Sequence, residues 1–173
     1  MITQEALERV RGWFTGRVPD DWQVAPLQVE VDREEVTVRL TIADVDLPDG
    51  TSAGEVEEAR AGRAKAFRED TRSRRMEIAR EAEHRFDRKV SWAVQVGDRA
   101  ELFTHVAAPV MTRLRQPQRQ VLDTLVDAGV ARSRSDALAW CVRLVGQHED
   151  DWLTELRQAM TTVADVRAKG PAA

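Results

Sequence analysis

The stretch that most constrains this fold is residues 109–146, in which a short extended run precedes two amphipathic helical patterns. Pro117 follows the extended run 110–115 and can open a helix, because the nitrogen of the first helical residue needs no hydrogen bond. Gly129 can end that helix in the left-handed conformation. Between these two residues, apolar side chains recur at helical spacing: Val121, Leu122, Leu125 and Val126.

A second helix is predicted after a tight turn. Ser133 stands three residues before Asp136, which is close to the capping box that starts many helices. The apolar side of this helix carries Ala137, Leu138, Cys141, Val142, Leu144 and Val145. A lone strand leaves its backbone groups unpaired, so the extended run 110–115 needs a partner strand from elsewhere.

Three motifs in this stretch resemble the ribbon-helix-helix family of DNA-binding proteins, the Arc and MetJ class. In that family a strand ending in Arg-Leu leads into a Leu-Asp-x-Leu helix and then a Ser-Arg-Ser-Glu-Ala turn. Here the corresponding residues are Arg113-Leu114, the run 122–125 and the run 133–137. The resemblance covers residues 109–146 only. It implies a homodimer in which two chains pair their strands and insert the ribbon into the major groove of double-stranded DNA.

The resemblance also implies which residues would touch DNA and which would join the two chains. Alternation along the strand would turn Met111, Arg113 and Arg115 toward the bases, with Arg113 best suited to guanine. Backbone amides at the start of the second helix would meet a phosphate, which adds Ser133, Arg134 and Ser135. The shared dimer core would contain Leu114, Leu125, Val126 and Leu138.

The N-terminal part of the chain alternates between helical and strand patterns. A helix capped by Thr3 is expected over 3–15, a hairpin from 29–31 and 36–42, a charged helix from 55 to about 87, and a second hairpin from 89–96 and 101–106. This αββαββ order predicts an α+β fold with two helices covering one face of a four-stranded sheet. A circularly permuted ferredoxin-like domain would give the same order.

Three segments follow from these patterns: an αββαββ domain over 1–107, a ribbon-helix-helix-like module over 108–147, and a terminal helix with a disordered tail over 148–173. The terminal helix carries a short heptad stripe, which consists of Trp152, Leu156, Ala159, Val163 and Val166. We expect this stripe to pack on the same chain or within the dimer, because two heptads are too few for a free coiled coil.

The distribution of charge is more informative than the net charge of −4. Residues 108–147 hold 6 basic and 3 acidic side chains, whereas acidic residues are in excess on both sides of that segment. This asymmetry favours a basic contact surface in the middle segment. A second basic run, 68–75, could meet phosphate, but the interleaved Glu69 and Asp70 favour a solvated helix face.

Catalytic motifs are absent from the sequence. The three histidines, His84, His105 and His148, lie far apart, and no nucleophile elbow, phosphate loop or dinucleotide fingerprint is present. We therefore expect no enzymatic activity, no metal and no cofactor. The start of the chain lacks the basic and apolar regions of a signal peptide and no run could span a membrane, so a cytoplasmic location is expected.

The sequence thus favours a homodimeric, DNA-binding transcriptional regulator that acts through its C-terminal module. The alternative is a dimeric adaptor that does not bind DNA. In that case the C-terminal module only dimerises, and the N-terminal sheet binds an unidentified protein or small ligand.

Overall fold

The computed structural model describes residues 3–169, which divide into two compact units, 1–108 and 109–173. The last four residues of the expected disordered tail, 170–173, lie outside the described residues. Together the two units give a mixed α+β architecture, a four-stranded sheet with helices followed by C-terminal helices, which confirms the predicted fold class.

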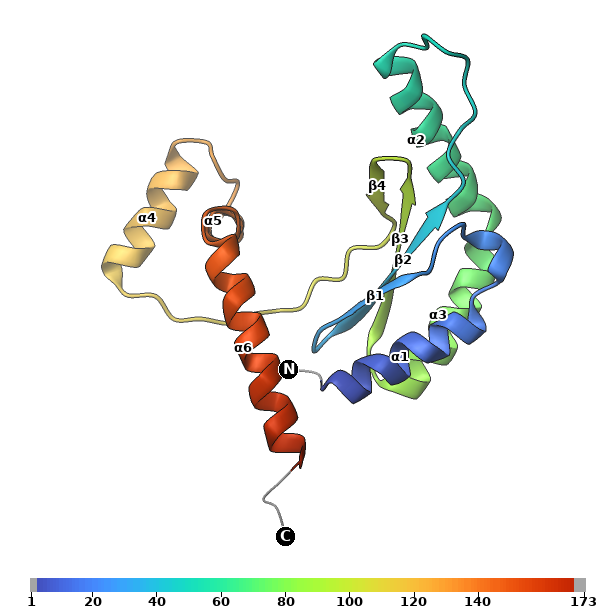
Figure 1. Ribbon diagram of the computed structural model, residues 1–173. Helices are drawn as coiled ribbons and strands as arrows, with labels where there is room; N and C mark the ends of the chain where they lie inside the picture. The colour runs from blue at the N-terminus through green and yellow to red at the C-terminus, as the bar shows by residue number, and fades with distance from the viewer. Residues whose placement is uncertain (1–2, 170–173) are drawn as a thin grey trace. The chain divides into compact units, whose positions relative to one another are not determined.

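The N-terminal unit has the predicted αββαββ order, with the second helix divided in two (Figure 1). Its elements are α1 (Gln4–Arg17), a short 3-10 turn (Asp20–Trp22), β1 (Gln28–Val31), β2 (Glu35–Ile42), α2 (Ala53–Asp70), α3 (Arg72–Phe86), β3 (Lys89–Val96) and β4 (Arg99–Leu102). Thr3 caps α1 as expected, since its hydroxyl accepts a hydrogen bond from the Ala6 nitrogen at 3.3 Å.

The four strands lie in sequential order, β1-β2-β3-β4. Both predicted hairpins are antiparallel, and the central strands β2 and β3 pair in parallel, with Glu35 opposite Lys89 and Ile42 opposite Val96. A ferredoxin-like domain is a split βαβ fold, in which another strand separates the two parallel strands that a helix joins. Here the joined strands are direct neighbours, so the ferredoxin-like alternative is wrong.

The core of this unit lies between the sheet and its helices. Alternate residues of β2 are buried, and α1, α2 and α3 all cover that one face (Figure 1). The core side chains from the strands include Val36, Val38, Leu40, Trp92, Val94 and Val96, and those from the helices include Val10, Phe14, Ala64, Ile78 and Ala82. Burial of this apolar face is the main force that holds the sheet to the helices.

Two element boundaries differ from the sequence-based expectation. The long helix breaks at Thr71, whose hydroxyl donates to the Phe67 carbonyl at 2.5 Å while its backbone ends α2 and begins α3. The final strand ends at Leu102 instead of 106, and Phe103 then turns into the core. Neither change could be predicted from local sequence. The break at Thr71, for example, lies within an uninterrupted helical pattern.

The described part of the C-terminal unit forms the helices α4 (Gln116–Asp127), α5 (Arg134–His148) and α6 (Asp150–Lys169). Gly129 has the predicted left-handed conformation, with φ of +73°, between α4 and α5. Residues 104–115 form neither helix nor strand, so the expected strand at 110–115 is not present in the described chain. Its backbone has no partner strand in a single copy.

Candidate functional site

The small core of the C-terminal unit is built by Leu122, Ala131 and Ala137. The four side chains expected in a shared dimer core all pack against it while staying half-buried: Leu114, Leu125, Val126 and Leu138. They therefore already contribute to the core of a single chain. Whether they also meet a second copy stays a prediction.

Large apolar side chains remain exposed on α5 and α6. Val142 is 65% exposed, and Trp152 at the start of α6 is 55% exposed. The rest of the exposed set on these helices is Leu144, Val145, Leu156, Met160, Val163 and Val166. The heptad stripe on α6 is thus not covered within the described C-terminal unit, and monomeric proteins seldom leave such a set of side chains in water.

The predicted DNA-contacting residues fall into two groups. Met111, Arg134 and Ser135 line one pocket of about 360 Å³, to which Leu114 and Leu138 also contribute. The remaining residues, Arg113, Arg115 and Ser133, do not line that pocket.

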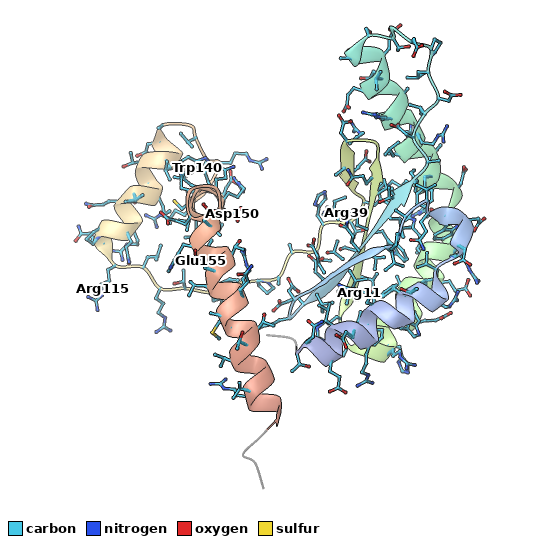
Figure 2. All side chains as sticks on the ribbon, viewed as in Figure 1. Arg11, Arg39, Arg115, Trp140, Asp150 and Glu155 are labelled. Atoms are coloured by element: carbon cyan, nitrogen blue, oxygen red, sulfur yellow. The ribbon has the colours of Figure 1, made fainter. Side chains whose placement is uncertain are left out.

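Individual residues of the predicted DNA-contacting set differ in their exposure and in their hydrogen-bond partners. Met111 is 96% exposed, and Arg115 lies exposed at the start of α4 (Figure 2). Ser133 caps α5 by accepting a hydrogen bond from the Asp136 nitrogen at 3.2 Å. Arg134 is committed to a bidentate ion pair with Asp123, at 2.6 and 2.8 Å.

The pair between Arg134 and Asp123 ties α5 to α4 within one chain. The Arg134 guanidinium lowers the pKa of the Asp123 carboxyl, chiefly through their hydrogen bonds. Arg134 is therefore less free for phosphate than the sequence suggested. Arg113 and Arg115 are exposed, whereas in the described part of the C-terminal unit Arg132 and Arg134 form ion pairs with Asp136 and Asp123.

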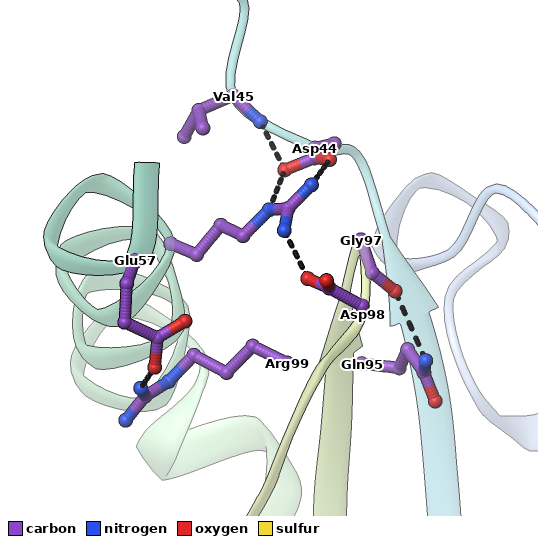
Figure 3. Close-up of polar contacts among 8 residues, drawn as sticks. Asp44, Val45, Glu57, Gln95, Gly97, Asp98 and Arg99 are labelled. Carbon is purple, nitrogen blue, oxygen red and sulfur yellow. Dashed lines mark hydrogen bonds and ion pairs between the residues drawn. The ribbon is translucent and has the colours of Figure 1, made fainter. Parts of the chain in front are cut away.

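A cluster of opposite charges closes one end of the N-terminal sheet. Asp44, just beyond β2, and Asp98, in the turn between β3 and β4, face the same guanidinium group (Figure 3). That group belongs to Arg60 of α2, which donates to Asp44 at 2.7 and 3.0 Å and also pairs with Asp98. The Arg60 hydrogen bonds are the main cause that lowers the pKa of Asp44.

A different arginine cluster lies where α2 meets α3. Arg75 is only 6% exposed, although its residue type is rarely buried without a charged partner. Its Nε donates to Thr71 Oγ1 at 2.9 Å and its Nη2 donates to the Arg68 carbonyl at 2.6 Å. Both acceptors are neutral, and burial, with Arg68 and Arg72 nearby, lowers the pKa of Arg75 to about 10.

An aromatic ring holds this second cluster together. The guanidinium carbons of Arg75 and Arg68 lie 4.9 and 5.5 Å from the centre of the Phe103 ring, which is the range of cation–π contacts. The sequence favoured a solvated helix face for the run 68–75, and this holds for the residues of the run other than Thr71 and Arg75, which are buried. The missed indication was Phe103, whose distance along the chain hid its contact with the arginines.

Within residues 3–169, no group of three or more His, Cys, Asp and Glu side chains is placed to hold a metal ion. Among the helices described, none combines the length and the apolar character that a membrane crossing requires.

Comparisons with known proteins identify both units. Residues 8–102 match the family described as "Rv1265-like protein, N-terminal domain", and residues 115–167 match the "Mb1296 C-terminal domain". Uncharacterized protein Rv1265 of Mycobacterium tuberculosis and uncharacterized protein Mb1296 of Mycobacterium bovis are each 57% identical to the chain over 159 residues. The alignments cover 92% of this chain and 69% of each relative. No solved structure matches the chain significantly.

These matches correct the family suggested by the sequence motifs. The model that matches residues 115–167 is that of the Mb1296 C-terminal domain, and no ribbon-helix-helix family is recognised. The motifs at 113–114, 122–125 and 133–137 instead have structural roles within the C-terminal unit. They provide a side chain for the small core, an ion pair between α4 and α5, and a cap for α5.

Proposed function

The chain belongs to the Rv1265-like family, and we propose that it works as a cytoplasmic homodimer that binds double-stranded DNA through its C-terminal unit as a regulator. The proposal no longer depends on a β-ribbon. The observation that carries it is the combination, within residues 109–173, of an uncovered apolar helix surface and exposed arginines without carboxylate partners.

The uncovered apolar surface supports the dimer. On α6, Trp152, Leu156 and Val163 repeat at heptad-compatible spacing and are 55%, 42% and 43% exposed. Such a stripe can bury its apolar surface against the same stripe of a second copy, as in a coiled coil. The core of this unit has only three buried side chains among the described residues, so we expect additional burial between two copies to stabilise it.

The exposed arginines support DNA as the partner. Arg113, Arg115 and Arg119 fall within seven residues before and at the start of α4. Arg119 donates to the Leu114 carbonyl at 2.7 Å, which fixes the turn that presents the other two. Duplex DNA offers regularly spaced phosphates, and a dimer would present two such sets of arginines to it.

The DNA-binding proposal is tested by the salt dependence of binding. We expect wild-type protein to bind mixed genomic duplexes with an affinity that falls steeply as salt rises. The double variant Arg113→Gln/Arg115→Gln removes four arginines from the dimer, and it should reduce the slope of log affinity against log salt by about 3.6, since each phosphate contact contributes about 0.9. The matched control is Arg9→Gln/Arg11→Gln, which removes two exposed arginines from α1. Equal slopes for both double variants would contradict the proposal.

The dimer is tested by light scattering. Wild-type protein should have twice the chain mass of 19.5 kDa at micromolar concentration. Leu156→Asp should shift the mass toward the monomer, because a carboxylate cannot be buried in an apolar interface without a partner. Gln158→Asp places the same charge on an exposed position of α6 and should leave the dimer intact. A monomeric wild-type protein would refute the dimer.

The adaptor remains the second candidate function, and the Arg75 cluster favours it. A dimer that binds no DNA even at low salt would leave the C-terminal unit as a dimerisation element only. The N-terminal unit, with its buried arginine at the α2–α3 break, would then be the part that meets a ligand or protein.

A further inference from the structure

Among the described residues of the N-terminal unit, no carboxylate is paired with Arg75. The ion pairs there are formed by other cations, namely Arg17, Arg60, Arg74, Lys89 and Arg99. Arg75 instead has two neutral hydrogen-bond acceptors and a phenyl ring, with the cations Arg68 and Arg72 as its charged neighbours. A buried cation surrounded by cations is unfavourable unless an anion joins it.

A space for an anion lies beside this cluster. A pocket of about 530 Å³ is lined by Ala61, Lys65, Arg68, Glu69, Arg72 and Glu101. The three cations follow each other at spacings of three and four along α2 and α3, which places them on one side of the helices. The volume falls within the usual range for small-molecule sites.

The two carboxylates of the pocket do not cancel its positive charge. Glu101 is within 3.3 Å of Arg99, which lies outside the pocket lining and pairs with Glu57 as well, so the charge of Glu101 is partly compensated. The three cations Lys65, Arg68 and Arg72 outnumber Glu69 and Glu101 in the lining, and Arg75 lies close enough to Arg68 and Arg72 for them to lower its pKa. The pocket therefore retains a surplus of positive charge. Arg68 and Arg72 are exposed, so an anion from solvent can reach them.

A purely structural role does not account for arginine at position 75. An apolar side chain of similar length would fill the same space beneath Phe103 without the cost of burying a charge. The Phe103 ring instead holds the guanidinium groups of Arg75 and Arg68, and the Arg68 Nη2 donates to the Phe103 carbonyl at 3.3 Å. The cluster thus holds two guanidinium groups in fixed positions, which favours tight recognition of an oxyanion.

We propose that the pocket at the α2–α3 break binds a phosphate-bearing small molecule, with Lys65, Arg68 and Arg72 contacting the phosphate and Arg75 supplying buried positive charge behind them. A phosphate fits better than a single carboxylate, because its higher charge balances more of the surplus. This site lies in the N-terminal unit and is independent of the DNA contacts proposed for residues 109–173.

The test uses inorganic pyrophosphate as the probe and the full chain. Arginine Nε–H resonances are followed by nuclear magnetic resonance during the titration, with sodium chloride at equal ionic strength as the reference. The Arg75 Nε–H is held by Thr71 and should give a resolved signal. Pyrophosphate should shift the signals of Arg68, Arg72 and Arg75 in a saturable manner, and chloride should not.

Two variants and one control complete the experiment. Arg72→Gln should weaken pyrophosphate binding about tenfold, as expected for loss of a charge-assisted hydrogen bond. Lys65→Gln should also weaken it. The control Arg74→Gln removes a neighbouring cation that is paired with Glu77 at 2.9 Å, and should bind like wild type. Equal binding by Arg72→Gln and Arg74→Gln, or shifts that chloride reproduces, would overturn the proposal.

Discussion

Arg60 and Arg75 lie on the same crossover between β2 and β3, yet the charge of Arg60 is neutralised by carboxylates and the charge of Arg75 is not. Arg60 reaches carboxylates at both ends of its guanidinium, from Asp44 and Asp98. Arg75 is more deeply buried and has only neutral acceptors and neighbouring cations. The carboxylates of the chain itself neutralise Arg60, which thereby joins α2 to the end of the sheet. Arg75 keeps an uncompensated charge that a bound anion could neutralise, which is why we propose the ligand site there.

The pKa values express the same difference. Hydrogen bonds to Glu81 or Asp44 raise the pKa values of Arg17 and Arg60 above the ordinary value, whereas burial and repulsion lower that of Arg75. A base with a lowered pKa in the folded state destabilises the fold while it is protonated. This penalty is present at neutral pH and is relieved only as pH rises above about 10. A bound anion would relieve it at neutral pH.

The largest expected effect comes from Gly97, which makes the Arg60 cluster possible. Its φ is +59°, and a Cβ there would overlap the Arg60 guanidinium and the Asp44 carboxylate. Gly97→Ala should therefore lower the free energy of unfolding by about 2–3 kcal/mol, from backbone strain and the displaced ion pair. Gly62→Ala is the control. Gly62 lies inside α2 with open space around it, so alanine should stabilise the protein by about 0.5–1 kcal/mol in denaturant titrations.

Removal of the neutralised arginine should have the next largest effect. Arg60→Met leaves Asp44 and Asp98 facing each other and unfastens α2 from the β3–β4 turn. We expect the melting temperature to fall by a few degrees in circular dichroism. No change would mean that the cluster is only a surface ion pair without structural weight.

Replacement of the unpaired arginine should have a smaller effect of opposite sign. Arg75→Met removes a buried charge and keeps the volume beneath Phe103, so the free energy of unfolding should stay equal or rise by about 1 kcal/mol. The same variant should lose the stabilisation that pyrophosphate gives to wild type. A strong loss of stability would show that the hydrogen bonds to Thr71 and Arg68 outweigh the burial of charge.

The smallest expected effect is on pH dependence. The Asp44 pKa is lowered from 3.8, so its contribution to stability is present above that pH and is lost as pH falls through the lowered value. Below pH 3.8, wild type should lose stability more steeply than Asp44→Asn. The difference should shrink in the Arg60→Met background, where the largest cause of the lowered pKa is gone and the hydrogen bond from the Val45 nitrogen remains. Urea titrations at several acidic pH values would measure it.

Local patterns made most of the fold predictable. The β2 alternation, the Thr3 cap and the Gly129 stop depend on neighbouring residues, and all appear as expected. The strand order could not be predicted from local patterns, because pairing of β2 with β3 depends on contacts across the whole crossover. The strand at 110–115 failed for a related reason, since its pairing needed a second chain, and three motif matches could not establish that chain's presence.

The candidate sites were less predictable than the fold. Arg113 and Arg115 could be identified from charge in the sequence, and both are exposed as a DNA contact requires. The pairing of Arg134 with Asp123 was missed, because it joins two helices whose packing was unknown. The Arg75 cluster was missed because the interleaved acidic residues made the run look solvated, while its aromatic neighbour Phe103 follows a distant strand.

The parallel pairing of β2 with β3 also sets the order in which the N-terminal unit can fold. Each hairpin joins strands that are close in sequence, so β1–β2 and β3–β4 can form early from nearby residues. The central pair meets only after the ends of the α2–α3 crossover come together, which costs loop-closure entropy before any contact repays it. Long-range pairing of this kind slows folding. The rate-limiting step should therefore be the joining of two early hairpins along β2 and β3, and substitutions such as Val38→Ala in that seam should slow refolding more than those at the outer strands.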